Sequence, residues 1–142
     1  AERENTNRRP LHGIMMDINN FKNINDNWGH NIGDRAICVM GNILFKSIPD
    51  TGMAIRYAGD EFIVLSNRSK LKVEMMLDEL LRKNPIMFML QEEARHISFS
   101  YGVVEFGEMP GDIYTMISEA DHRMYQCKTK NHSRLQKKEK TL

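Results

Sequence analysis

Cysteine is scarce in this 142-residue sequence, and no long apolar run is present. The two cysteines, Cys38 and Cys127, stand far apart and form no CxxC pair, so neither a disulfide framework nor a zinc knuckle is expected. No apolar run approaches the ~20 residues of a membrane span, and no signal peptide opens the chain. We therefore expect no membrane contact by this segment, although an anchor could lie outside it.

Neither sign of charge dominates the sequence. Lysine and arginine number 20 and aspartate and glutamate 19, which gives a formal net charge of +1. A protein that coats duplex DNA carries a strong basic excess, so no nucleic-acid partner is expected. A small anionic ligand remains compatible with this balance, because it needs only a few local charges.

The composition that is present suits one globular domain. The residues are 41% hydrophobic and 27% charged, which is ordinary for such a domain. A chain of this length can bury roughly 68–70% of its unfolded surface without a disulfide or metal. We expect a polar lead-in over residues 1–10, the domain itself over 11–130, and a basic, disordered tail over 131–142.

Hydrophobic periodicity predicts the element order β-α-α-β-β-α-β-α. The strands are expected over residues 11–16, 53–57, 62–65 and 96–105, and the helices within 19–29 and over 31–48, 70–84 and 112–128. The second and third strands form a tight hairpin in which Gly59 is the residue best able to take a positive φ. This order favours a two-layer α+β sandwich of the ferredoxin-like, palm type, with a mixed or antiparallel sheet of four to five strands.

Three acidic residues are expected to meet at one edge of that sheet. Asp17 ends the first strand, and Asp60 and Glu61 sit at the hairpin tip. The ferredoxin-like plan puts the first strand beside the hairpin, and carboxylates that converge repel one another unless a cation neutralises them. Mg²⁺ or Mn²⁺ prefers such oxygen ligands and suits phosphoryl or nucleotidyl transfer. The alternative from the residues alone is that these acids are solvated turn residues.

Five motifs in order resemble those of the GGDEF family, the diguanylate cyclases. Residues 56–62 read RYAGDEF, which is similar to the family's RYGGDEF. The other four are DINNFKNIND at 17–26, GHNIGD at 29–34, SFSYGV at 98–103 and ADHRMYQCK at 120–128. Together they span about residues 11 to 128, and the combination is highly specific.

The resemblance implies a nucleotidyltransferase of bacterial second-messenger signalling. The family condenses two GTP molecules into cyclic di-GMP, releasing pyrophosphate, and each subunit of a homodimer holds one GTP. The 3′-hydroxyl of each GTP attacks the α-phosphate of the other. The implied cofactor is Mg²⁺ or Mn²⁺, with two ions per active half-site. By the same resemblance, Asp17, Asp60 and the backbone carbonyl of Ile18 hold the metal, Asp60 is the general base, and Glu61 supports the site.

The resemblance also assigns residues that bind the substrate. Asn25 and Asp34 match the positions that read the guanine edge; alone, Asn25 could be a turn residue and Asp34 a helix N-cap or first-turn acid. Lys128 matches a triphosphate-binding lysine, or is a charge favoured at a helix C-terminus. The remaining positions surround the ribose, the phosphates or the guanine, and Phe21 could equally be core: Phe21, Lys22, His30, Arg56, Ala58 and Gly59.

The sequence departs from the family pattern at several positions. Ala58 replaces the first glycine of the motif, where a methyl group could crowd the guanine or the turn. Asn19 replaces the second acid of D-x-D, and His132 stands where the family often has arginine. Pro49 and Gly52 occupy the positions of the arginine and aspartate of the inhibitory product site, so feedback through that site is not expected. The family's upstream D-x-L-T-G-L-x-N-R-R segment is not found.

Three functions remain open from the sequence. The first is a GTP-using diguanylate cyclase, and the second is a catalytically weak or inactive relative that binds GTP or another nucleotide and regulates an attached domain. The third is a structural dimerisation module without metal-dependent GTP binding. Retention of Asp17, Asp60 and Glu61 argues for the first. Family members are commonly attached to sensory or regulatory domains, and a cytosolic nucleotide substrate implies that this domain faces the cytoplasm, including where the parent is a membrane protein.

Overall fold

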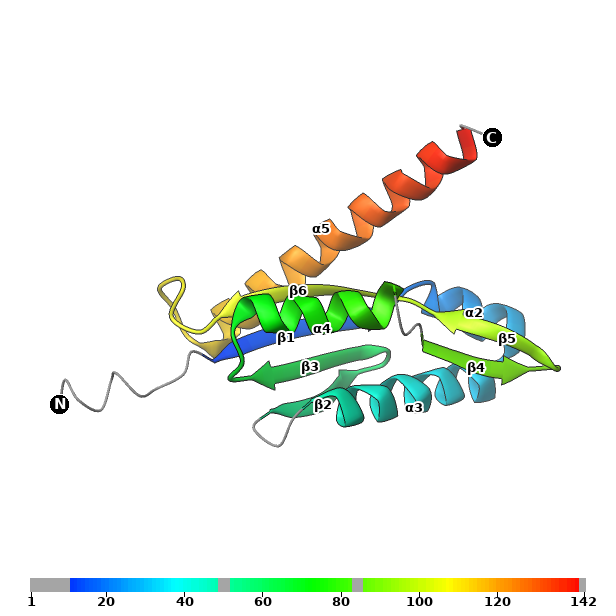
Figure 1. Ribbon diagram of the computed structural model, residues 1–142, viewed down its shortest axis with the longest axis horizontal. Helices are drawn as coiled ribbons and strands as arrows, with labels where there is room; N and C mark the ends of the chain where they lie inside the picture. The colour runs from blue at the N-terminus through cyan, green and yellow to red at the C-terminus, as the bar shows by residue number, and fades with distance from the viewer. Residues whose placement is uncertain (1–10, 49–51, 83–85, 141–142) are drawn as a thin grey trace.

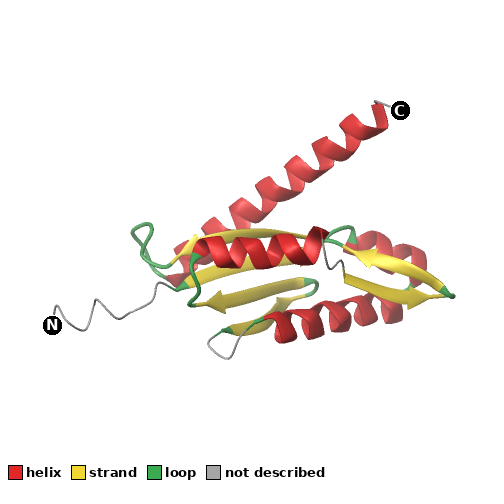
Figure 2. Cartoon of the chain, in the orientation of Figure 1, coloured by secondary structure: helices red, strands yellow, loops and turns green. Residues whose placement is uncertain are grey.

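The computed structural model of the chain describes residues 11–48, 52–82 and 86–140, with side chains described as far as Thr129 (Figures 1 and 2). Its elements follow the order of the chain: β1 (His12–Ile18), α2 (Phe21–Trp28), α3 (His30–Ser47), β2 (Met53–Ala58), β3 (Glu61–Ser66), α4 (Lys70–Arg82), β4 (Ile86–Leu90), β5 (Glu93–Ile97), β6 (Phe99–Glu105) and α5 (Ile113–Lys140).

The main sheet has four strands in the order β2-β3-β1-β6, and every neighbouring pair is antiparallel. The first strand, β1, therefore lies at the centre and pairs with the hairpin strand β3, as predicted. The helices and this antiparallel sheet give the α+β class expected from the sequence. The lead-in over residues 1–10 lies outside the described residues.

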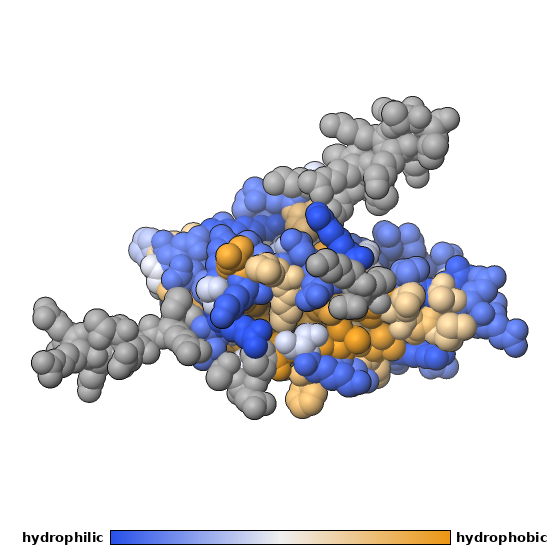
Figure 3. Space-filling model, in the orientation of Figure 1, coloured by the Kyte–Doolittle hydropathy of each residue, from blue (hydrophilic) through white to orange (hydrophobic). Residues whose placement is uncertain are grey.

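Alternation of side chains along β1 divides the core between the two faces of the sheet. Ile14, Met16 and Ile18 point to the face covered by α3 and α4, where they join the larger hydrophobic cluster. On the face seen in Figure 3, apolar surface gathers in the middle, over the region where α3 and α4 lie, and hydrophilic surface borders it. Met15 points the other way and packs with Met116 of α5.

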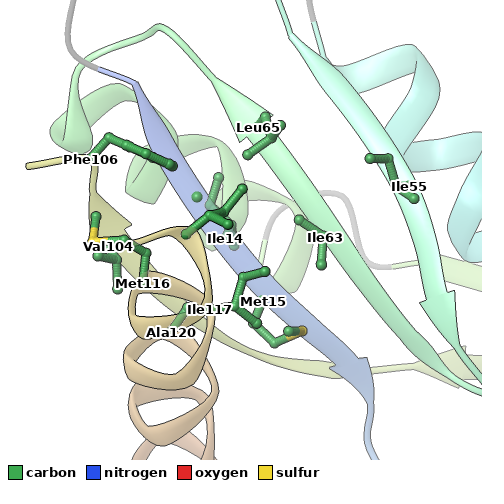
Figure 4. A pocket seen from close by; sticks show the side chains of 12 residues that line it. Ile14, Met15, Ile55, Ile63, Leu65, Val104, Phe106, Met116, Ile117 and Ala120 are labelled. Atoms are coloured by element: carbon green, nitrogen blue, oxygen red, sulfur yellow. The ribbon is translucent and has the colours of Figure 1, made fainter. Parts of the chain in front are cut away.

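Helix α5 covers the β1 and β6 part of the second face and leaves an apolar pocket beside β2 and β3 (Figure 4). The pocket holds about 140 Å³, and Ile55 and Ile63 line it on the sheet side while Met116 and Ile117 line it from α5. None of the residues that line it is among those predicted to bind metal or substrate. Because a triphosphate requires cationic or polar donors, this apolar pocket is not suited to hold one.

A second, two-stranded sheet of β4 and β5 was not predicted from the sequence. The expected single strand over residues 96–105 is instead two strands, β5 and β6, separated at Ser98, whose carbonyl accepts a hydrogen bond from Asn19 N–H at 2.9 Å. The turn between β4 and β5 places Gln91 and Glu92 at φ 52° and 66°. A turn of two non-glycine residues with positive φ carries none of the usual hairpin signals, which explains the omission.

The last helix is longer than predicted. The apolar pattern placed its end near Lys128 and a disordered tail after residue 130, but α5 continues to Lys140. Residues 129–140 contain neither glycine nor proline and include four lysines, which favour helix, so nothing in the sequence stops the helix. Among the helices described, none is both long and apolar enough to cross a membrane.

Candidate active site

The β2–β3 hairpin presents Gly59 and Asp60 at its turn. Gly59 has a φ of 50°, as the sequence predicted, whereas Ala58 ends β2 without a positive φ, so its methyl group does not strain the turn. Pairing shifts between Arg56 and Ala58, which makes Tyr57 the extra residue of a β-bulge. The side chain of Arg56 donates from Nε to the carbonyl of Gly59 at 2.9 Å and thereby fastens the turn to the strand.

The turn and the end of β1 come together at one edge of the sheet. Asp17 lies directly opposite Glu61 in the β1–β3 register, and the N–H of Ile18 donates to the carbonyl of Asp60 at 3.4 Å. These are the residues that the sequence predicted to converge. Within the described residues, no three or more His, Cys, Asp or Glu side chains already form a cage for a metal ion.

Asp17 is buried and forms an ion pair with Lys128 of α5. Its side chain is 7% exposed, and its Oδ2 accepts the ammonium of Lys128 while its Oδ1 is buried without a hydrogen-bond partner. Burial raises the pKa of Asp17, Lys128 opposes this shift, and the negative charges of Asp60 and Asp121 add to it. The structure therefore joins a predicted metal ligand to a predicted phosphate-binding lysine.

A fourth carboxylate, Asp121 of α5, adds to the negative charge at this edge. The pKa of Glu61 is raised by burial first, then by the charges of Asp121 and Asp60. Such mutual repulsion is relieved by a cation, and the unpartnered Oδ1 of Asp17 is an oxygen able to receive one. Carboxylate oxygens are the type of ligand that a hard divalent ion such as Mg²⁺ prefers. Asp121 received no role from the sequence, because its spacing on a helix gave no sign that it would face the hairpin.

Helices α2 and α3 hold the residues predicted to read guanine. Asn25 is half-buried, its Oδ1 has no partner, and it packs so closely on Gly33 that a Cβ there would lie 1.8 Å from Oδ1. Helix α3 begins at His30 with Gly29 as its N-cap, so Asp34 lies beyond the N-cap and first turn. Asp34 is exposed, which leaves its carboxylate accessible to a ligand.

The other predicted substrate contacts lie on the surface around these helices and the hairpin. Lys22, His30 and Arg56 are exposed, as are Ala58 and Gly59. Phe21 is half-buried and packs against the larger core cluster, in agreement with its alternative assignment to the core. The placement of these residues leaves their binding roles as predictions.

Comparison with known proteins identifies the family of this chain. The family model described as "Diguanylate cyclase, GGDEF domain" matches residues 1–134. This chain belongs to the GGDEF family. A diguanylate cyclase of Vibrio cholerae serotype O1 is 30% identical to this GGDEF domain over 127 residues, which are 89% of the chain and 40% of that protein. The chain thus spans less than half the length of this curated relative.

Two solved GGDEF structures extend the likeness to the fold. The active GGEEF domain of a diguanylate cyclase from Vibrio cholerae is 30% identical, with a TM-score of 0.74, over 91% of this chain and 83% of that one. The GGDEF domain of DgcB from Caulobacter crescentus, solved in complex with c-di-GMP, is 26% identical, with a TM-score of 0.73, over 84% of this chain and 72% of that one. These similarities confirm the family and the palm-type fold.

The departure at Asn19 has a structural counterpart in this GGDEF domain. Asn19 Nδ2 donates to Ser98 Oγ at 3.0 Å, and Ser100 Oγ donates to Asn19 Oδ1 at 2.7 Å. The two serines of the SFSYGV segment therefore fasten the loop that follows β1 to β6. Their separation from Asn19 by about 80 residues explains why sequence reasoning gave them no role. The departure at Pro49 and the side chain of His132 lie outside the described residues.

Proposed function

We propose that this GGDEF domain is a diguanylate cyclase that condenses two GTP molecules into cyclic di-GMP and two pyrophosphates. The observation that carries this proposal is the meeting of Asp17, Asp60 and Glu61 at one sheet edge, with Lys128 directed into the same group. A purely structural domain gains nothing from placing Asp17 and Glu61 where burial, and then the charges of neighbouring acids, raise the pKa of both.

In the proposed reaction, the 3′-oxygen of one GTP forms a bond to the α-phosphorus of the other. The bond between the α- and β-phosphates breaks, pyrophosphate leaves, and Asp60 accepts the proton of the hydroxyl. Two such transfers close the ring, so we propose a homodimer in which each subunit holds one GTP. A bound Mg²⁺ or Mn²⁺ pair would supply charge neutralisation and acidify the hydroxyl.

The residues of this chain supply binding and orientation. Asp17, Asp60 and the carbonyl of Ile18 would hold the metal, and Glu61 would support them. Asp34 would accept from N1–H and the exocyclic amine of guanine, a pair of donors that adenine does not offer together, with Asn25 beside it.

Lys22 and Lys128 would neutralise the triphosphate, and His30, Arg56 and Gly59 would contact the ribose and phosphates. Where Ala58 meets the guanine, its methyl group would reduce the rate.

The test is to incubate concentrated protein with GTP and Mg²⁺ or Mn²⁺ and to measure cyclic di-GMP and pyrophosphate. Asp60→Ala is expected to lower product formation by about 10²-fold or more, the contribution of one general base. Glu79→Ala, which removes an exposed acid from α4, is the matched control and is expected to behave as the unaltered protein.

Calorimetry with GTP separates the alternatives if no product forms. Binding of GTP without turnover would replace the cyclase proposal with a nucleotide-binding regulator of an attached domain. Absence of both binding and turnover would leave a structural module.

A further inference from the structure

The contact between Lys128 and Asp17 joins the last helix to the central strand across 111 residues of sequence. Lys128 lies inside α5, well before the helix ends at Lys140, so the alternative of a charge favoured at the helix C-terminus does not explain it. Its side chain is 39% exposed whereas that of Asp17 is 7% exposed. The lysine can therefore move into solvent at small cost, but the carboxylate cannot.

An ammonium group and a divalent ion make the same demand on Asp17. Each is a cation that takes carboxylate oxygens, and Lys128 already engages Oδ2. The negative charges of Asp60 and Asp121 also repel the carboxylate of Asp17. A positive charge therefore stabilises the site, whether an ammonium group or a metal ion supplies it. A metal ion that binds here has to displace the lysine or share the carboxylate with it.

We propose that Lys128 serves as the resident cation of this site, which competes with the divalent ion for Asp17 and is drawn away when a triphosphate binds. The inference rests on the proposed function, because it takes Asp17 as a metal ligand. An incoming triphosphate offers Lys128 several anionic oxygens, and its departure frees Oδ2. Metal and nucleotide then bind with positive coupling, and by linkage each raises the affinity for the other.

The ion pair between Lys128 and Asp17 also matters before nucleotide binds. Without nucleotide, Lys128 neutralises part of the negative charge around Asp17 and so stabilises the buried carboxylate. On this proposal Asp17 needs no metal to balance its charge before nucleotide binds, and the ion is recruited chiefly together with the substrate.

The test measures Mn²⁺ binding directly, by the loss of the free-ion signal in electron paramagnetic resonance, with no turnover required. Without nucleotide, Lys128→Met is expected to bind Mn²⁺ about tenfold more tightly than the unaltered protein, the size expected for one charge-assisted hydrogen bond. Lys72→Met removes the same charge from an exposed position on α4 and is expected to stay within about twofold. Lys128→Arg retains a cation and is expected to bind no more tightly than the unaltered protein.

A second arm adds α,β-methylene GTP, whose α–β bridge cannot be cleaved. The analogue is expected to strengthen Mn²⁺ binding to the unaltered protein more than to Lys128→Met. Only the unaltered protein has a lysine that the analogue can draw away from Asp17. Thermal unfolding confirms that each variant is folded, and Lys128→Gln repeats the comparison with a neutral side chain that still forms hydrogen bonds.

The outcomes separate this inference from the proposed function. Equal or weaker Mn²⁺ binding by both Lys128→Met and Lys128→Gln, with binding abolished in Asp17→Asn, would overturn the competition and leave the metal site in place. Unchanged Mn²⁺ binding in Asp17→Asn, with and without the analogue, would overturn the metal site and the inference together.

Discussion

Gly33 packs against Asn25 so closely that no side chain fits between them. A Cβ on Gly33 would lie 1.8 Å from Asn25 Oδ1, 2.9 Å from its Cγ and 3.3 Å from Cζ of Phe21. The absence of a side chain at this position therefore fixes where the Asn25 amide points. If Asn25 reads guanine as proposed, then Gly33 sets the affinity for GTP without touching it.

Gly33→Ala is expected to weaken GTP binding by about tenfold, because the added methyl group displaces the Asn25 amide and one hydrogen bond to guanine is lost. Calorimetric titration with GTP measures the effect. Gly41→Ala in the same helix is the matched control, since a Cβ there meets only Phe62 Cε1 at an ordinary 3.7 Å. The control is expected to gain about 0.5–1 kcal/mol in stability and to bind GTP normally. Equal GTP affinity in the two variants would contradict the role of Gly33.

Individual residues show where sequence reasoning is sufficient. Asp17, Asp60 and Glu61 could be predicted to meet because strand pairing fixes which residues lie opposite each other, and turn residues mark the hairpin tip. Asp121 and the serine partners of Asn19 could not, because helix orientation and contacts across about 80 residues depend on packing rather than on local pattern.

Arg123 anchors the first half of helix α5 to the sheet and to the loop that precedes it. Its guanidinium donates to the carbonyl of Val103 at 2.7 Å and to Glu119 at 3.0 Å, and it forms an ion pair with Glu108. The hydrogen bond from Arg123 lowers the pKa of Glu108 from 4.5 to about 2. The loop residue Glu108 thus remains ionised over the ordinary range of pH and ties the loop to the helix.

Glu108→Gln is expected to lower the free energy of unfolding at neutral pH, because the ion pair is lost. The folded-state pKa of Glu108 is depressed, so its contribution is complete above the ordinary value of 4.5 and is lost as the pH falls toward about 2. The difference between the variant and the unaltered protein should therefore shrink over that range in denaturant titrations at successive pH values. Glu79→Gln on α4 serves as control, and a Glu108→Gln difference that stays constant from pH 7 to pH 2 would refute the ion pair's contribution.

Elements were predicted with uneven success, and each error has a local cause. The hairpin of β2 and β3 was identified because Gly59 supplies the positive φ that its turn requires. The hairpin of β4 and β5 was missed because Gln91 and Glu92 supply it instead, at a cost that the sequence does not reveal. The end of α5 was placed too early because the loss of an apolar stripe marks where packing stops, not where the helix stops.

At the scale of the whole molecule, one close contact sets the distance between the main sheet and α5. Gly102 of β6 lies beneath α5, where a Cβ would stand 2.1 Å from the carbonyl oxygen of Ala120 and 2.5 Å from the nitrogen of Met124. These atoms belong to the helix backbone and cannot rotate aside. The contact sets the height of α5 above the sheet and therefore the reach of Lys128 toward Asp17.

Gly102→Ala is expected to lower the free energy of unfolding by about 1–3 kcal/mol, because the helix has to move away from the sheet. Chemical denaturation measures the loss. Gly13→Ala places a methyl group on the same face of the neighbouring strand at 4.0 Å from Leu65 and is the matched control. A loss in Gly102→Ala no greater than in the control would show that α5 is not held at this height by Gly102.

The register of β1 against β3 also limits how the chain can change in length. Asp17 faces Glu61 at the end of a ladder that runs unbroken from His12 opposite Ser66. One residue inserted within β1 turns every later side chain of that strand, Asp17 included, to the opposite face and removes this carboxylate from the site. The tip of the β4–β5 hairpin carries neither carboxylate of this pair. A change in the number of residues is therefore compatible with the site at the β4–β5 turn, whereas within β1 it displaces Asp17.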